Sequence, residues 1–539
     1  MENSELTPEP APRNRIRTWA RVLSVLLVLL ALIITPPLLN VNRLQRRIAA
    51  NMSQSLGRPV HLDPNVKLHL LPMPGLTLSN LVVSEDPAFG AEPIIRANTV
   101  EATLRPGSLW RRQVEVASIR FVEPSLNLVR NQRGQWNIES LLMHGSQIDT
   151  APTEQRQPGP TPRFPYIDAT NARVNIKMGD EKMPFSLIET DFALWLPSPQ
   201  QWRLRMEGKP TRTDLTLSDP GLIRLDGSLD RSPTKSDVPI EMHASWHDVP
   251  LGEATKILAG ADAGWRGMLT ADADLTGTLG DAKLSTKITV NDLRRADFVT
   301  AHPLNLTTEC TGSFDAMTEV VSHPECQLPV GNSGSVSALA ADIDLTTLHP
   351  HGLQIGSPGV PESWLLDWVR IFVEHIPASE NPAGTVAGSL VYVDSQDGHE
   401  GFWQGEMHGD YNPLQGQSPA GEDGKPNFSI LADEDGFTLA SLNLMPSDKT
   451  GSLILSGTAD PRHYALRLDG QATPAQLRSL QGLLPPLGES LKDAVPDIGA
   501  DSAKPIKVDI TCTRAWNEKE SCNAASAPET KATRGRNTH

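Results

Sequence analysis

The chain has little of what enzymes and nucleic-acid-binding proteins usually carry. Only 5% of its residues are aromatic, only 4 are cysteine, and its formal net charge is −16. This charge disfavours a nucleic-acid partner, because phosphate binding needs a basic surface. The sequence also has no Gly-x-Ser-x-Gly elbow, no P-loop and no dinucleotide-binding glycine motif. We therefore expect no enzyme activity, no cofactor and no nucleic-acid partner.

The four cysteines form two local pairs, Cys310 with Cys326 and Cys512 with Cys522. An even number at hairpin-like spacing, next to a membrane signal, permits disulfides in an oxidising compartment. Neither pair has the CxxC spacing of a metal site. We expect both disulfides, and four free thiols are the alternative.

Long apolar runs are also scarce, and the only one is Ala20–Thr35. It is shorter than the ~20 residues that a membrane span needs, but Trp19 and Pro36–Leu39 extend it, and Arg21 can reach the interface. We expect a single transmembrane anchor over residues 19–39. A cleaved signal peptide is the alternative, and no small-x-small cleavage site follows the run to favour it.

Arginines are more numerous before the expected anchor than just after it. The positive-inside rule then favours a cytoplasmic N-terminus, and the cysteine pairs favour an oxidising compartment for the rest. We expect a single-pass inner-membrane protein whose bulk is periplasmic, if the host is a double-membrane bacterium.

Beyond the anchor, apolar and polar residues alternate, as in Leu76–Leu78 and Val100–Leu104. A period of two predicts strands with one apolar face, and prolines and glycines separate them as in a meander. Glycine also recurs at strand centres, where it often marks a sharp bend or bulge. These glycines are Gly227, Gly277, Gly312, Gly388, Gly457 and Gly470.

The sequence thus predicts a mainly β fold, an elongated and curved antiparallel sheet with a few short helices. Helical spacing predicts those helices at Leu251–Leu258, Pro361–Ile376 and Ala475–Ala494. In the second, Trp364, Trp368 and Phe372 form a stripe that we interpret as core or plug, with an interfacial lid helix as the alternative.

Changes of composition divide the chain into segments. We expect a basic stub (1–18), the anchor (19–39), a first β region (40–143), a proline-rich linker or loop (144–165), a central β region (166–350), a C-terminal β region (351–512) and a polar tail (513–539).

A long meander must cover its apolar face. A sandwich or barrel does so with a second sheet, whereas an open curved sheet leaves a trough that costs about 25 cal/mol per Å² of exposed apolar area. A lid, a partner or a lipid chain can cover such a trough. The pattern alone leaves the sandwich array and the open trough as equal alternatives.

Candidate metal sites are weak. The alternation around His243 and His247 predicts a strand that separates them by about 13 Å, so we expect two surface histidines. His349-Pro350-His351 is predicted to be a turn without nearby acidic ligands. Asp394–Gly398 and Asp433–Gly436 resemble calcium loops but lack the closing glutamate, which favours hairpin turns. We expect no bound metal.

Three motifs near the N-terminus carry a resemblance to a known family. They are Leu71–Leu78, Asp86–Gly90 and Asn131–Asn137, and the series resembles the N-terminal region of the AsmA family of membrane-anchored envelope proteins. Segments Trp202–Leu204 and Gly208–Asp214 are similar to the middle of such chains. The resemblance implies an apolar β-groove that holds acyl chains, an inner-membrane anchor, and a role in phospholipid transport or outer-membrane assembly.

With the groove that this resemblance implies, the alternating residues nearest the anchor become the candidate lining for membrane phospholipids. They are Val66, Leu68, Leu70, Leu76, Leu78, Val100, Ala102 and Leu104. The alternative is a scaffold that docks envelope proteins and carries no lipid. A filled core would favour the scaffold, and an open apolar surface would favour the groove.

Overall fold

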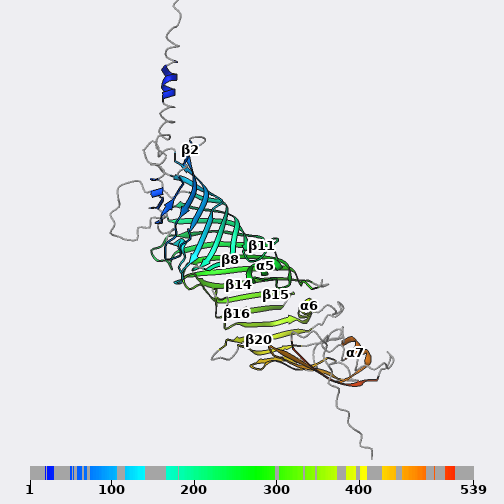
Figure 1. Ribbon diagram of the computed structural model, residues 1–539. Coiled ribbons are helices and arrows are strands. Elements are labelled where there is room, and N and C mark those ends of the chain that lie inside the picture. The colour runs from blue at the N-terminus through cyan, green and yellow to red at the C-terminus, as the bar shows by residue number, and fades with distance from the viewer. Residues whose placement is uncertain are drawn as a thin grey trace, which may run out of the picture. The chain divides into compact units, whose positions relative to one another are not determined.

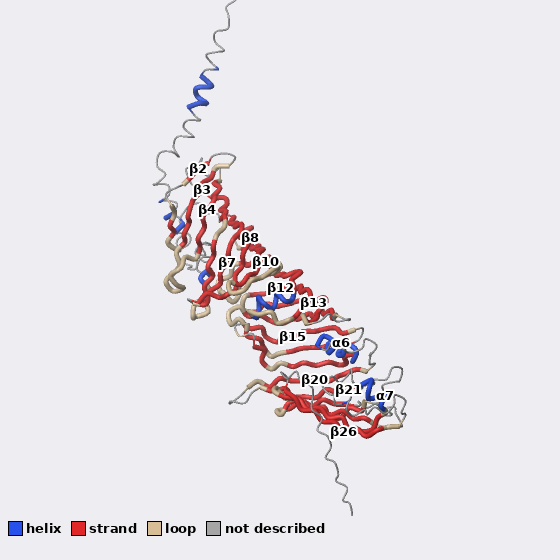
Figure 2. Tube along the Cα trace, turned by 45° about the vertical axis from the view of Figure 1, so that its right-hand side comes forward, coloured by secondary structure: helices blue, strands red, loops and turns tan. Residues whose placement is uncertain are grey.

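The computed structural model describes residues 19, 21–28, 46, 49–50, 52–53, 57–63, 66–69, 73–105, 116–139, 166–179, 181–198, 200–297, 303–331, 334–345, 347, 349–372, 384–395, 401–409, 428–444, 452–480, 491 and 504–515. The chain divides into two compact units, Met1–Asp214 (unit 1) and Leu215–His539 (unit 2). Each unit is built from neighbouring strands with few helices (Figures 1 and 2). The predicted mainly β class with a few short helices is confirmed. The seven predicted segments stay a prediction.

The described residues of unit 1 form nine strands. They are β1 (Val60–His61), β2 (Lys67–His69), β3 (Gly75–Val83), β4 (Ile95–Leu104), β5 (Val116–Val122), β6 (Ser125–Arg130), β7 (Tyr166–Met178), β8 (Glu181–Ser198) and β9 (Gln201–Arg212). Most neighbours are antiparallel, but β7 runs parallel to both β5 and β6. A parallel pair needs a crossover of a dozen or more residues. The predicted proline-rich segment 144–165 falls in this crossover and lies outside the described residues.

Unit 2 contains the remaining strands. They are β10 (Leu222–Asp230), β11 (Pro239–Pro250), β12 (Trp265–Thr278), β13 (Asp281–Arg295), β14 (Leu304–Asp315), β15 (Val320–Val330), β16 (Gly334–Leu339), β17 (Asp342–Asp344), β18 (His349–His351), β19 (Gln354–Pro361), β20 (Thr385–Val393), β21 (Phe402–Gly409), β22 (Phe428–Asp433), β23 (Gly436–Asn443), β24 (Leu453–Ala459), β25 (His463–Ala472) and β26 (Ile506–Ala515). The described pairings among them are all antiparallel, and nearly every strand pairs with its neighbours in sequence. The exception is the short β17–β18 hairpin, which pairs with β15 while β16 pairs with β19.

The meander places the strand connections of unit 2 at two opposite ends. At one end, which we call the helix rim, α5 (Leu251–Ala259) joins β11 to β12, α6 (Glu362–Phe372) follows β19, and α7 (Pro474–Leu480) follows β25. At the other end, the hairpin rim, turns join pairs such as β12–β13, β14–β15 and β22–β23. Figure 1 shows α6 and α7 on the same side of their strands.

The three helices agree with the sequence prediction in type and place. The helix α5 ends at Gly260, whose φ of 76° and whose N–H bond to the Lys256 carbonyl form a left-handed C-cap. The predicted continuations, 373–376 after α6 and most of 481–494 after α7, lie outside the described residues.

Three of the predicted strand-centre glycines, Gly277, Gly388 and Gly470, have positive φ, and a Cβ at Gly388 (φ 140°) would meet the backbone oxygen of Glu406 on the adjacent strand. That these glycines bend the sheet stays a prediction. Register shifts also occur where there is no glycine. Asp248 and Asp292 adopt φ of 55° where the register shifts in β11 and β13, which is the local signature of a β-bulge.

Residues 21–28 are helical. Within the portion of the chain that is described, no helix combines the length and the apolarity needed to cross a membrane. Most of the predicted anchor 19–39 lies outside that portion.

Candidate functional site

Unit 1 buries its apolar face in a packed core. Of the eight residues predicted to line a groove, six are only 1–8% exposed: Val66, Leu76, Leu78, Val100, Ala102 and Leu104. They contact one another together with larger side chains, including Phe121, Phe192 and Met52. In this unit the predicted lining residues therefore lie inside a closed core. Period-two alternation is the same for a covered and an open face, which is why the sequence did not distinguish them.

Two residues of the predicted lining set remain without a structural outcome. Leu68 lies on β2, where its backbone pairs with Leu76, and its side chain lies outside the described set. Leu70 also lies outside the described residues.

Two of the motifs that carry the family resemblance, Asp86–Gly90 and Asn131–Asn137, are linked in unit 1 by a buried polar network. Asn137 is 0% exposed. Its side-chain NH₂ donates to the Glu85 carboxylate at 2.5 Å and to the Asn127 carbonyl at 2.8 Å, and its side-chain oxygen accepts from the Val129 N–H at 3.1 Å. In the sequence, Asn137 is only the last residue of the Asn131–Asn137 motif, and no local signal there indicates these hydrogen bonds.

Arg58 extends this network toward the N-terminus. Its guanidinium lies 2.8 Å from the Asp86 carboxylate and 3.7 Å from that of Glu85. The backbone N–H of Ala88 and then the Arg58 side chain hold the pKa of Asp86 below its ordinary value. The network thus joins the segment before β1 to the Asp86–Gly90 motif and to Asn137, and it is structural in character.

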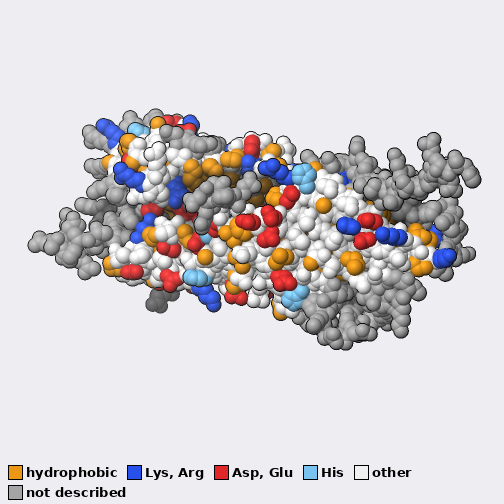
Figure 3. All heavy atoms as spheres, turned by 90° about the horizontal axis from the view of Figure 1, so that it is seen from below, with side chains coloured by type: hydrophobic (Ala, Val, Ile, Leu, Met, Phe, Trp, Pro, Cys, Tyr) orange, Lys and Arg blue, Asp and Glu red, His pale blue; other side chains and the backbone are white. Residues whose placement is uncertain are grey.

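Unit 2 presents a different apolar face. On β12 and β13 the alternate residues Ala271, Leu275, Leu284 and Ile288 are half-buried, while positions between them, such as Lys283, are exposed. A fully packed core would leave such residues almost inaccessible. Figure 3 shows scattered hydrophobic side chains among basic, acidic and other side chains on the surface seen from below. At β12 and β13, unit 2 therefore has one polar face and one half-exposed apolar face, whereas the apolar face of β24 to β26 lies in a packed core with α7.

A row of small side chains crosses the middle of this apolar face. Six successive strands, β11 to β16, each place one directly paired residue in it. All six residues are half-buried. The small-residue row consists of Ala244, Ala273, Thr286, Cys310, Cys326 and Ala338.

Larger apolar side chains flank the small-residue row on both sides. Toward the helix rim the neighbours are Ile288 and Leu328, and toward the hairpin rim they are Leu275 and Leu284. With strands about 4.8 Å apart, five steps give a shallow path of about 24 Å across the strands.

Two members of the row are bonded to each other. Cys310 and Cys326 form a disulfide between β14 and β15, with a Cα–Cα distance of 3.9 Å. Cys512 is buried and disulfide-bonded, and Cys522 lies outside the described residues. The sulfur atoms of Cys310 and Cys326 keep this part of the row apolar.

Within the described residues of unit 2, α5, α6 and α7 cover the apolar face along the helix rim. Ala254 of α5 packs on Val249 and Leu269, and Ile371 of α6, 1% exposed, packs on Leu293 and Leu304. At the other end of unit 2, Leu477 of α7 packs among Leu453 and Leu468. None of the residues of the small-residue row belongs to these helix-packed clusters.

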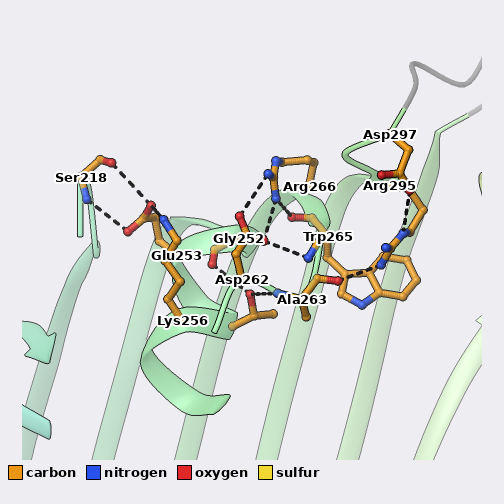
Figure 4. A network of polar contacts seen from close by, with 12 residues as sticks. Ser218, Gly252, Glu253, Lys256, Asp262, Ala263, Trp265, Arg266, Arg295 and Asp297 are labelled. Atoms are coloured by element: carbon orange, nitrogen blue, oxygen red, sulfur yellow. Dashed lines mark hydrogen bonds and ion pairs between the residues drawn. The ribbon is translucent and has the colours of Figure 1, made fainter. Parts of the chain in front are cut away.

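Polar contacts fix α5 in this position (Figure 4). Glu253 accepts from the Ser218 N–H at 3.1 Å and pairs with Lys256 at 2.8 Å. Beyond the helix, Arg295 donates to the Ala263 carbonyl at 2.8 Å and stacks 5.0 Å from the Trp265 ring. The connection between β11 and β12 is thus held at several points.

The histidines of β11 lie on the polar face. His243 and His247 are on one strand, as predicted, and each contacts an aspartate of β12: Asp274 at 2.8 Å and Asp272 at 2.6 Å. Among the residues that the structure describes, no group of three or more His, Cys, Asp or Glu side chains could hold a metal ion.

The interpretation of His349-Pro350-His351 as a turn without acidic neighbours was wrong. These residues form β18, because they continue the ladder with β17. His351 lies 2.6 Å from Asp342 and His349 lies 3.4 Å from Asp394. The hydrogen bond with Asp342, with smaller contributions from its charge and those of Asp394 and Asp344, raises the pKa of His351. Sequence spacing alone does not reveal these cross-strand neighbours.

The second calcium-like segment is a hairpin turn, as predicted. Asp433 pairs with Gly436 at the end of β22 and β23, and the Asp433 side chain accepts from the Asp435 N–H at 3.0 Å. Of the first segment, Asp394–Gly398, residues 396–398 lie outside the described residues.

Comparison with known proteins gives one match. Residues 14–182 match the sequence model of the AsmA family. Neither the curated proteins nor the solved structures gave a match.

Proposed function

We propose, on the premise that the N-terminal region of this chain, residues 14–182, belongs to the AsmA family, that the protein is a membrane-anchored envelope protein that binds phospholipid acyl chains. The chains lie on the half-exposed apolar face of unit 2, and lipids move across the strands along the small-residue row. The role is passive lipid transport or support of outer-membrane assembly.

The small-residue row is the observation that carries this proposal. Residues such as Ala273 and Ala338 carry small side chains between larger apolar neighbours, and in this proposal acyl chains lie over them. The row is about 24 Å long across six strands, so a lipid that lies across it can pass sideways from strand to strand.

Energetics support an occupant for this face. Apolar area left in water costs about 25 cal/mol per Å², and the face extends over many strands. Phospholipid tails would remove that cost without requiring specific polar contacts. The polar face, with pairs such as Lys287–Glu309 at 3.1 Å, would stay in water.

The N-terminal helix supports attachment to a membrane. Its described residues include Leu23, Leu26 and Leu27, which are 58–63% exposed. A series of exposed leucines in water is unfavourable, so a lipid environment is the simplest cover for them. We propose an inner-membrane, single-pass anchor with a cytoplasmic N-terminus and a periplasmic bulk.

Lipid counting by native mass spectrometry tests the proposal. The full-length protein, purified in mild detergent from envelope extract, should release with bound phospholipids. The variant Ala273→Glu/Thr286→Glu puts two carboxylates in the small-residue row and should lose most of them. The control Thr276→Glu/Ser285→Glu places the same charges on the opposite face of the same strands and should keep them. Equal lipid content in both variants would remove the basis of the proposal.

The packed core of unit 1 favours a second role, that of a docking scaffold, for this part of the chain. Its apolar residues, such as Leu78 and Val100, are only 1–2% exposed and pack against one another. A filled core is what a docking scaffold needs. If the wild-type protein carries no phospholipid, the scaffold becomes the better explanation for the entire chain.

A further inference from the structure

The hairpin rim of unit 2 carries a set of aromatic side chains on the apolar face. Each stands near the turn end of its strand, in register with another residue of that face. Only 5% of the chain is aromatic, so this gathering is not a consequence of composition. The aromatic rim consists of Phe314, Tyr392, Trp403, Phe437 and Tyr464.

Tyr392 and Trp403 are the central pair of the aromatic rim. They are directly opposite on β20 and β21, and their rings meet edge to face at 5.3 Å. Both are half-buried. Tyr and Trp rings favour positions where an apolar region meets water or lipid headgroups, because each has an apolar body and a polar tip.

The opposite rim is built differently. Its tryptophans are engaged in packing under the helices: Trp364 and Trp368 pack against each other at 5.8 Å and join the cluster around Ile371. Trp246 donates its indole N–H to the Pro220 carbonyl at 2.9 Å. With α5 fixed by the polar contacts of Figure 4, α5 and α6 cover the helix-rim ends of β11 to β14 with apolar side chains, whereas the described hairpin rim has no helix.

From this asymmetry we infer the orientation of the bound lipid: headgroups stand at the hairpin rim beside Tyr392 and Trp403, and acyl chains cross the small-residue row with their ends toward the α5–α6 wall. The inference rests on the proposed function. The strands are long enough for it, because the nine residue steps from Leu269 to Thr278 on β12 span about 30 Å, against about 15 Å for one acyl layer.

The orientation assigns separate tasks to the parts of the face. The aromatic rim admits lipids sideways and holds the glycerol region at the water boundary. The small-residue row accommodates the middle of the chains. The wall of α5 and α6 closes the apolar end, so α6 is a fixed stop and does not act as the entry lid that its amphipathic sequence also permits.

Photo-crosslinking with two phospholipid probes tests the orientation. The full-length protein is incubated with vesicles of phosphatidylethanolamine and phosphatidylglycerol that contain a lipid with a diazirine next to the glycerol ester, or one with the diazirine at the chain terminus. The labelled peptides are then identified by mass spectrometry. We expect the glycerol-side probe to label the peptides with Tyr392 and Trp403 with a several-fold preference, and the chain-end probe to prefer the peptides with Leu306 and Trp364.

Each other outcome is decisive. The reverse pattern, or equal labelling of both rims by both probes, overturns the orientation while leaving lipid binding intact. Labelling by neither probe on any strand of the apolar face overturns the proposed function as well.

A variant provides a second measurement. Tyr392→Ala/Trp403→Ala should spread the glycerol-side label away from the hairpin rim, whereas Gln404→Ala, on the polar face of β21, should leave the label in place. An unchanged label in the double variant contradicts the role of the aromatic rim. The circular dichroism spectrum of each variant verifies that the sheet is formed.

Discussion

Cys310 and Cys326 face each other across β14 and β15 and are joined by a disulfide in the middle of the small-residue row. The bond therefore does two things at once. It links two strands of unit 2, and it places sulfur rather than a polar group on the proposed lipid path.

Removing this disulfide should destabilise the protein. For Cys310→Ala/Cys326→Ala we expect a loss of about 2–4 kcal/mol in the free energy of unfolding, because the unfolded chain is no longer constrained. Urea unfolding without reductant, followed by circular dichroism, measures the difference. Identical midpoints for wild type and variant would contradict the expectation. Intact masses with and without reductant should also differ, by the hydrogens gained at each reduced pair.

The two apolar faces should respond differently to the same truncation. Leu78→Ala in the packed core of unit 1 should cost about 2–5 kcal/mol. Leu284→Ala on the half-exposed face of unit 2 should cost clearly less, because water already reaches that side chain. Urea unfolding of both variants makes the comparison, and equal costs would mean that the face of unit 2 is as tightly packed as a core.

Gly388 should not tolerate a side chain. In Gly388→Ala the φ of 140° is strained, and the new Cβ meets the Glu406 backbone oxygen. We therefore expect the free energy of unfolding to fall by at least about 1 kcal/mol. The matched control is Gly359→Ala, where no heavy atom lies within 4 Å of the added Cβ. Thermal unfolding compares the melting temperatures of the two variants. An equal loss in Gly359→Ala would contradict the explanation by backbone strain and the close Cβ contact at Gly388.

Asn137 should stabilise unit 1 through its three hydrogen bonds. Asn137→Ala leaves Glu85 and the backbone groups of Val129 and Asn127 without this partner, and each such buried group costs about 1–3 kcal/mol. A double-mutant cycle with Glu85→Gln isolates the pair energy. Strictly additive effects of the two substitutions would show that the bond between them contributes nothing.

His351 should give the β17–β18 hairpin a pH dependence. Its pKa is raised in the folded protein by Asp342, so its contribution is complete below the ordinary histidine pKa and disappears as pH rises through the raised value. The effect is small because His351 is half-exposed. The melting temperature of wild type should fall between pH 6 and 8 relative to that of His351→Gln, and parallel curves would refute the contribution.

The sequence predicts much of this fold because strand alternation and helical spacing are local properties. The stripe Trp364–Trp368 predicts α6, and the alternation around His243 correctly predicts a strand instead of a metal-binding helix. The glycine at position 388 has the positive φ that favours glycine there.

Burial and strand register could not be predicted, because they depend on neighbours that are distant in the chain. Leu78 and Ala273 both alternate with polar residues, yet one is buried in a core and the other lies on a half-exposed face. The bulges at Asp248 and Asp292 carry no glycine to announce them. The register that aligns Ala273 with Thr286 and Cys310 exists only once the strands pair.

The meander of unit 2 has a consequence for how the protein folds. Almost every strand finds its partner in the segment that immediately precedes it, so the contacts are close in sequence and loop closure is inexpensive at each step. A chain that leaves a translocation channel from its N-terminus can add each strand to the growing edge as soon as it emerges, much as repeat proteins propagate from one unit to the next. Assembly of unit 2 can thus begin before synthesis ends, which shortens the time during which its apolar strands face water alone.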